Sequence, residues 1–65
     1  MNVKEARLNA RYSQREVAEH LGVSRPTYIK MEQNPGTITM EDAHKLAEFF
    51  GVSVDDIVFF EPNYS

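Results

Sequence analysis

Two helix starts separated by a very short turn constrain this chain more than any other feature of its sequence. The first is the run Ser13-Gln14-Arg15-Glu16. It has the pattern of a capping box, in which the serine hydroxyl accepts the third helical N–H and the glutamate reaches back to the serine N–H. Gly22 suits a helix end because glycine adopts left-handed backbone angles readily. A second start follows at once, so the sequence predicts two helices, over residues 14–21 and 25–33, joined by a tight turn.

Apolar residues recur at helical spacing in the rest of the chain, and no segment alternates as a strand would. The runs Thr39-Met40-Glu41-Asp42 and Ser53-Val54-Asp55-Asp56 place a cap and first-turn acids at two further starts. The expected apolar face of the fourth helix consists of Met40, Ala43, Leu46, Ala47 and Phe50. The fold class is therefore all-α, a compact domain that occupies residues 1–65, with five helices over residues 2–10, 14–21, 25–33, 40–50 and 54–58.

Length and composition limit how such a domain can be stabilised. A chain of 65 residues buries a thin core. It has no cysteine for disulfides, and His20 and His44 lack the close spacing of a zinc site, so no metal or cofactor is expected. A homodimer is the remaining source of stability. The chain has no apolar run of roughly 18 residues and no signal-like N-terminus, so a soluble, cytoplasmic protein is expected.

The charge is divided between the two halves of the chain. The total is −3, which by itself argues against nucleic acid because DNA binding depends on basic side chains. Residues 1–33, however, carry six basic and four acidic side chains, whereas residues 34–65 carry one basic and six acidic. Local charge decides binding more than the total does, so the first half is the candidate surface for DNA.

The sequence resembles the phage repressor and Cro type of helix-turn-helix protein, also called XRE-like. The similarity spans nearly the whole chain without a gap. The residues that carry it are the run from Ser13 to Thr27 (Ser13-Gln14-Arg15-Glu16-Val17-Ala18-Glu19-His20-Leu21-Gly22-Val23-Ser24-Arg25-Pro26-Thr27), then Glu32, Lys45-Leu46-Ala47 and Gly51-Val52-Ser53-Val54-Asp55-Asp56-Ile57. The resemblance implies a lambda-repressor-like fold with a central helix-turn-helix, and a transcriptional regulator, of repressor type, that binds double-stranded DNA through helix 25–33 in the major groove.

Helical geometry divides the residues of this recognition helix into two faces. At about 100° per residue, one arc holds Arg25, Pro26, Ile29, Lys30 and Gln33, and the opposite side holds Tyr28, Met31 and Glu32. The resemblance implies the same division, with base-edge contacts at Arg25, Pro26, Ile29 and Lys30 and phosphate contacts at Gln14 and Thr27. Tyr28 is expected in the core, with its hydroxyl near the DNA backbone.

The side chains on the outer arc suit contacts with bases. Arg25 can bind guanine O6 and N7 together, Lys30 can reach guanine or phosphate, and Ile29 can pack on a thymine methyl. The alternative is that both cations are solvated surface charges. Pro26 leaves the helix start open, because proline disfavours helical angles at the preceding residue. Either Ser24 caps the helix or Arg25 does.

Two further contacts are expected within the protein or between its copies. Arg7 follows the core-facing Ala6, and Glu32 lies on the inward face of the recognition helix. Unpaired charges there would be costly, and the resemblance places an arginine–glutamate pair at these positions. At the other end of the chain, Val58, Phe59 and Phe60 exceed what a short terminal helix can bury, which predicts a dimer interface. The alternative is that these aromatic residues fold back over the core.

Other functions are weighed against DNA binding. The acidic second half and the apolar run Ile57-Val58-Phe59-Phe60 also fit a protein-interaction module, such as an antitoxin that holds a small toxin partner. An enzyme is not expected, because the sequence has no cysteine, no histidine beside a candidate nucleophile and no glycine-rich phosphate loop. Residues 33–37, after the recognition helix, carry no charge, so this loop adds little phosphate affinity.

Overall fold

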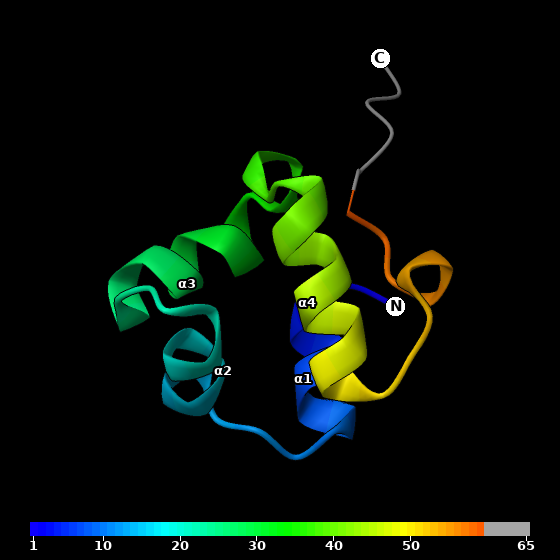
Figure 1. Cartoon of the computed structure of the whole chain (residues 1–65), viewed down its shortest axis with the longest axis horizontal. Helices are drawn as coiled ribbons and strands as arrows, with labels where there is room; N and C mark the ends of the chain where they lie inside the picture. The colour runs from blue at the N-terminus through cyan, green and yellow to red at the C-terminus, as the bar shows by residue number, and fades with distance from the viewer. Residues whose placement is uncertain (60–65) are drawn as a thin grey trace.

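The structure, a computed structural model, describes residues 1–59 of the chain, and Figure 1 shows short helices joined by tight connections. No strand occurs in this described part. The elements are α1 (Val3–Asn9), α2 (Gln14–Leu21), α3 (Arg25–Gln33), the 3₁₀ turn η1 (Pro35–Thr37), α4 (Met40–Phe50) and the 3₁₀ turn η2 (Val54–Asp56). The all-α fold class is confirmed.

The turn between α2 and α3 forms as the local sequence predicts. Gly22 ends α2 with left-handed angles (φ 75°, ψ 28°), and the N–H of Val23 returns to the carbonyl of Ala18 at 3.0 Å. This pairing satisfies carbonyl groups at the end of α2. Ser24 then starts α3, so the two helices are joined without a flexible linker and pack directly on each other.

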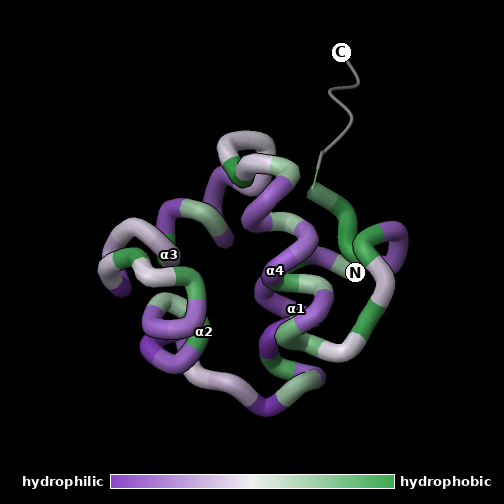
Figure 2. The backbone as a smooth tube through the Cα atoms, viewed as in Figure 1, coloured by the Kyte–Doolittle hydropathy of each residue, from purple (hydrophilic) through white to green (hydrophobic). Residues whose placement is uncertain are grey.

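One hydrophobic core holds the helices together. All four α-helices contribute buried side chains to it, and Ile57 adds one from the segment after η2. The core consists of Val3, Ala6, Val17, Ala18, Tyr28, Met31, Leu46, Ala47, Phe50 and Ile57. Figure 2 shows how apolar and polar residues alternate along α4, and how an apolar run follows η2. The core therefore supports the inner side of α3 from the other three helices.

The prediction of a fifth helix over residues 54–58 is wrong. Ser53 and Asp56 do form a capping box, but only the single 3₁₀ turn η2 follows it. Ile57 leaves that turn in an extended conformation (φ −109°, ψ 129°) and is buried in the core. The N–H of Val58 then donates to the carbonyl of Met1 at 2.7 Å. Core packing and this bond to the N-terminus therefore take the place of a longer helix.

The other helix boundaries agree with the sequence prediction to within one residue. α2, α3 and α4 begin and end as predicted, and α1 is one residue shorter at each end because Asn2 and Ala10 are its N-cap and C-cap. Met40 was wrongly placed on the apolar face of α4: its side chain is 67% exposed. Met40 is the first residue of that helix and precedes its first buried residue, Ala43.

Candidate nucleic-acid interface

The buried and exposed faces of α3 follow the division that the helical period predicts. Tyr28 and Met31 are buried in the core. The exposed residues of the helix are Arg25, Pro26, Thr27, Lys30 and Gln33. Ile29, assigned to the outer face, is half-buried at its edge, whereas the side chain of Glu32, assigned to the inner face, is only 6% exposed. α3 therefore presents a polar, basic outer surface whose position is set by its apolar inner surface.

The start of α3 settles which residue is its cap. Ser24 has extended angles, its hydroxyl accepts the N–H of Thr27 at 3.3 Å, and Arg25 is the first helical residue. Pro26 in the first turn removes an N–H that would have no partner within the helix. The Ser24 hydroxyl also donates to Oγ1 of Thr27 at 2.9 Å. The hydroxyl hydrogen of Thr27 thus remains available for an acceptor outside the protein.

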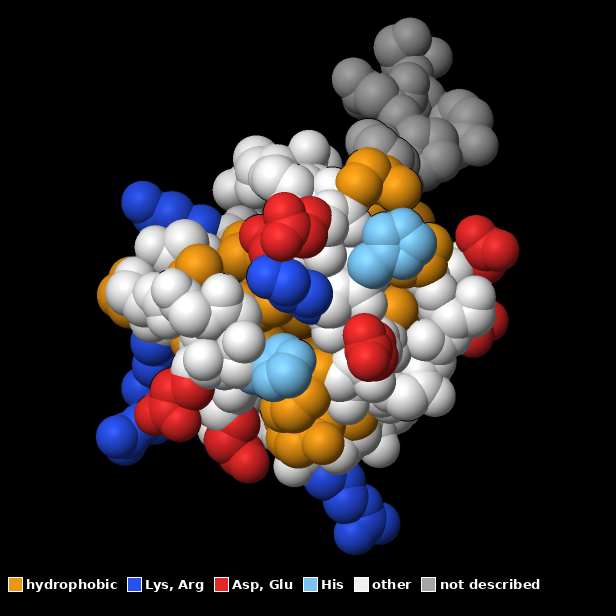
Figure 3. Space-filling view, in the orientation of Figure 1, with side chains coloured by type: hydrophobic (Ala, Val, Ile, Leu, Met, Phe, Trp, Pro, Cys, Tyr) orange, Lys and Arg blue, Asp and Glu red, His pale blue; other side chains and the backbone are white. Residues whose placement is uncertain are grey.

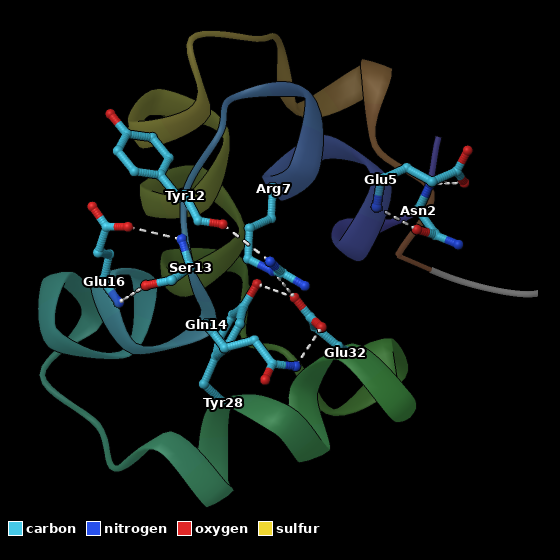
Figure 4. Close-up of polar contacts among 9 residues, drawn as sticks. All are labelled: Asn2, Glu5, Arg7, Tyr12, Ser13, Gln14, Glu16, Tyr28 and Glu32. Atoms are coloured by element: carbon cyan, nitrogen blue, oxygen red, sulfur yellow. Dashed lines mark hydrogen bonds and ion pairs between the residues drawn. The ribbon is translucent and has the colours of Figure 1, made fainter.

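A single carboxylate joins three helices behind this surface (Figure 4). Nε of Arg7, on α1, donates to Oε2 of Glu32 at 2.7 Å, and the Tyr28 hydroxyl donates to the same oxygen at 2.6 Å. Nε2 of Gln14, on α2, donates to the other oxygen, Oε1, at 3.2 Å. Arg7 also donates from Nη1 to the carbonyl of Tyr12 at 3.0 Å, which ties in the connection between α1 and α2. We call Arg7, Gln14, Tyr28 and Glu32 the Glu32 network.

The electrostatics of the Glu32 network favour the ionised forms of Arg7 and Glu32 and the neutral form of Tyr28. The side chains of Arg7 and Glu32 are only 8% and 6% exposed. Burial by itself would raise the pKa of Glu32, but hydrogen bonds from Arg7, Tyr28 and Gln14 outweigh it and lower that pKa below its ordinary value. The hydrogen bond to Glu32 likewise raises the pKa of Arg7. Burial, and then the contact with Glu32, raises the pKa of Tyr28, so its hydroxyl stays protonated as a donor.

The side chains of Tyr28 and Gln14 have hydrogen-bond partners that the sequence did not predict. The Tyr28 hydroxyl was expected near the DNA backbone, but Tyr28 is fully buried and its hydroxyl donates to Glu32. The side chain of Gln14 is half-buried, and its amide also donates to Glu32. Gln14 nevertheless remains the first residue of α2, and the first N–H groups of a helix have no carbonyl partner within it. Its main-chain N–H therefore still offers a donor at the start of α2, whereas its side-chain amide is engaged by Glu32.

A shallow polar cleft lies where residues at the starts of α1 and α2 meet the edge of α3. Its volume is about 230 Å³, and its walls are formed by Asn2, Lys4, Gln14, Ile29, Glu32 and Gln33. Lys4 was not singled out from the sequence. The available signal was its position three residues before Arg7 on the same helix, which places the two side chains on adjoining parts of one surface.

The predicted dimer residues lie at the C-terminal end of the described part. Val58 is exposed, and Phe59 is half-buried and packs against the core. Phe60 lies outside the described residues. Phe59 thus follows the alternative in which the aromatic residues cover the core, whereas Val58 faces solvent.

Two other kinds of site are absent from residues 1–59. No group of three or more histidine, aspartate or glutamate side chains in this part of the chain is arranged to hold a metal ion. None of the helices formed by these residues has the length and apolar character needed to cross a membrane.

Comparison with protein families gives one match over most of the chain. A family model described as helix-turn-helix matches residues 3–57, a range that contains α1 to α4 and the Glu32 network. No solved structure matches the chain.

Three curated proteins are similar to this chain. An uncharacterized HTH-type transcriptional regulator of Methanocaldococcus jannaschii is 41% identical over 49 residues, which cover 75% of this chain and 74% of the relative. The cryptic phage CTXphi transcriptional repressor RstR of Vibrio cholerae is 32% identical over 56 residues, or 86% of this chain and 50% of RstR. An uncharacterized HTH-type transcriptional regulator of Archaeoglobus fulgidus is 30% identical over 59 residues, or 91% of this chain and 83% of the relative.

Removal of Arg7 should strongly destabilise the protein. Arg7→Ala leaves the buried Glu32 carboxylate without its cation, which costs about 3 kcal/mol of unfolding free energy. Arg15→Ala is the matched control, because the Arg15–Glu19 ion pair is 79% and 69% exposed and should contribute no more than about 0.5 kcal/mol. Urea or thermal unfolding measures both. Unchanged stability for Arg7→Ala and for Glu32→Ala would contradict the assigned role of the pair.

The Glu32 network should also make the unfolding free energy of the protein fall as the pH is lowered into the acid range. Because the pKa of Glu32 is lowered in the folded state, its stabilising effect is complete above the ordinary value of 4.5 and is lost as the pH falls through the lowered value. Glu32→Gln should be less stable at neutral pH and should lose less stability than the wild type between about pH 5 and pH 2. Glu19→Gln, at an exposed carboxylate, is the control. An equal loss of unfolding free energy for wild type and Glu32→Gln over this pH range, measured by urea unfolding, would contradict this assignment.

Proposed function

This chain belongs to the helix-turn-helix family of DNA-binding transcriptional regulators, and from that premise we propose that it binds double-stranded DNA with α3 in the major groove. The resemblance to phage repressors is thereby confirmed at the level of the family. One observation carries the assignment of α3: its basic outer face is exposed along the helix while its inner face is fixed by the core and the Glu32 network. A rigidly held helix with such a face is the form in which this motif reads base edges.

The outer face supplies the chemistry for reading bases. Arg25, at the first position of α3, is proposed to bind guanine through O6 and N7, and Lys30, five residues further on, to reach guanine or a phosphate. Pro26 lies beside Arg25 and fits apolar contact with a base edge. Ile29 keeps part of its side chain exposed at the edge of the same face, and this part is proposed to pack on a thymine methyl.

Phosphate contacts are proposed at the start of α2, in the first turn of α3 and at the cleft between α1 and α3. Gln14 offers the N–H at the start of α2, where the helix dipole favours an anion, and Thr27 offers its hydroxyl hydrogen. Lys4 lines the same cleft as Gln14 and adds a cation there. These contacts are few and the protein carries a net charge of −3, so we expect modest affinity that is best measured at low salt.

We further propose that the regulator acts as a repressor and works in the cytoplasm. The relative RstR is named a transcriptional repressor. A protein that covers an operator with a small domain of this kind blocks access to the DNA without needing a further activity. The family is one of regulators rather than enzymes, and no cofactor is proposed.

A protein partner is a second proposal. The acidic second half of the chain and its exposed apolar side chains favour a role in holding another protein, such as a toxin, in addition to DNA. A small protein that copurifies with the chain in fixed stoichiometry would support it.

Loss of Arg25 or Lys30 should abolish specific binding while the domain stays folded. A random-sequence DNA selection at low salt first provides the binding site. In gel shifts on that site, Arg25→Ala and Lys30→Ala should each lose about 1–3 kcal/mol per half-site, because a base contact disappears. Lys4→Ala should instead weaken all sequences equally and lower the salt slope by about 1. Glu19→Ala, on the exposed side of α2, is the control.

The outcome that contradicts the assignment is specific. Equal affinity of wild type, Arg25→Ala and Lys30→Ala, with unchanged melting temperatures, would show that the recognition face lies elsewhere.

The protein should act as a homodimer that contacts DNA at two half-sites. The exposed Val58 supports an interface at the C-terminal end, and a two-fold axis there implies half-site centres about 10 base pairs apart or a multiple of it. In analytical ultracentrifugation, Val58→Lys should shift the protein to monomer and weaken DNA binding. Leu8→Lys, at an exposed apolar residue of α1, should do neither. Wild type that is monomeric at high concentration, with and without DNA, would contradict the proposal.

A further inference from the structure

An apolar groove opens between the start of α4 and the segment that runs through η2. It has a volume of about 270 Å³. Ile38 and Met40 line it on one side, Val54, Ile57 and Phe59 on the other, and the exposed Asp55 adds a carboxylate. Among the described residues, Met40 is the most exposed of the large apolar side chains. The groove therefore offers apolar surface to solvent at a position away from α3 and the cleft beside it.

The groove is a different surface from the proposed dimer contact at Val58. Ile57 is extended, and successive side chains of an extended segment point to opposite sides. Ile57 and Phe59 accordingly line the groove, whereas Val58 is exposed and does not line it. An occupant of the groove would leave Val58 uncovered.

Asp55 lines the groove, and three further carboxylates neighbour its lining residues in the sequence. Glu41 and Asp42 follow Met40, and Asp55 and Asp56 follow Val54. Figure 3 shows acidic side chains over α4 and η2 on this face, with lysine and arginine gathered mainly at the opposite edge of the molecule.

Cations compensate this charge only in part. Within residues 1–59, Glu41 alone of the four carboxylates has a cationic side chain within ion-pair distance, Lys45 at 3.4 Å, and that pair is exposed. The Met1 ammonium donates to the main-chain carbonyl of Asp56 at 3.2 Å and offsets one further charge. The surface around the groove that carries Glu41, Asp42, Asp55 and Asp56, called the rim below, therefore remains negative.

This charge selects among the possible occupants. DNA phosphates would be repelled by the rim. A second copy placed on the groove by a two-fold axis would set each rim against the same rim of its partner, and like charges face to face are costly. An apolar segment with positive flanks satisfies both the walls and the rim.

We propose that this groove binds a basic amphipathic helix of another protein, with its apolar side chains between α4 and η2 and its lysine or arginine side chains at the rim. Helices bind apolar grooves in this way through anchors about one turn apart. The inference rests on the proposal of a protein partner, to which it gives a place and a chemistry, and it does not depend on DNA binding.

The test is an NMR titration of the full 65-residue chain, labelled with ¹⁵N, by two synthetic helical peptides of about 14 residues. Both peptides carry leucines one turn apart; one has lysines at its remaining charged positions and the other has glutamates. We expect the lysine peptide to shift the amides of Met40, Val54 and Phe59 and to bind roughly tenfold more tightly than the glutamate peptide.

Two variants separate the groove from general charge attraction. Met40→Lys, at an exposed side chain, should abolish binding of the lysine peptide without changing the melting temperature. Leu8→Lys adds the same charge at the other large exposed apolar helix residue, 54% exposed, and should leave binding intact.

Three results would overturn the proposal. They are equal binding of the two peptides, amide shifts that avoid the groove or survive Met40→Lys, and groove amides that shift on dilution of the protein alone. The last result would identify a second copy as the occupant. Gel shifts with DNA report separately on the recognition face, so failure of one proposal does not imply failure of the other.

Discussion

The position of α3 depends on one buried carboxylate, Glu32, which accepts hydrogen bonds from Arg7 on α1, Gln14 on α2 and Tyr28 on α3 itself. A single ionised group thus connects three helices that share only a thin apolar core. Leaving such a charge unpaired is costly, so the arrangement tolerates little change in the angles between these helices. The outer face of α3 can therefore be polar and exposed, because its inner face and its link to α1 and α2 set its orientation.

Charge is distributed in keeping with this arrangement. The basic residues Arg25 and Lys30 lie on the exposed face of α3, and Lys4 lies at the cleft beside it, whereas α4 and η2 together hold five of the ten acidic side chains. A net charge of −3 thus coexists with a locally basic surface. The acidic surface on the other elements does not contact DNA in the proposed geometry, and it remains available to partners of opposite charge.

Much of the fold could be predicted because the sequence carries recognisable capping residues at the helix starts and glycines at the helix ends. Ser13 and Thr39 cap the helices that they were expected to start, and Gly22 and Gly51 end helices with left-handed angles. The cap of α3, which the sequence left open between Ser24 and Arg25, is Ser24. The pattern failed where tertiary contacts decide the conformation. Ser53 and two acids predict a helix, but burial of Ile57 and the bond from Val58 to Met1 end it after one turn. The cleft residue Lys4 and the bond from Gln14 to Glu32 depend on how α1 and α2 meet α3, which no local pattern contains.

The central claim is that the Glu32 network holds α3 so that its outer face meets base edges in the major groove. Intermolecular nuclear Overhauser effects between the protein and its selected DNA duplex test it most directly. The account predicts contacts from the methyl groups of Ile29 to a thymine methyl, and from the side chains of Arg25 and Lys30 to protons on the major-groove edge of the bases. Contacts that arise instead from α4 or η2, or that reach only minor-groove protons, would contradict it.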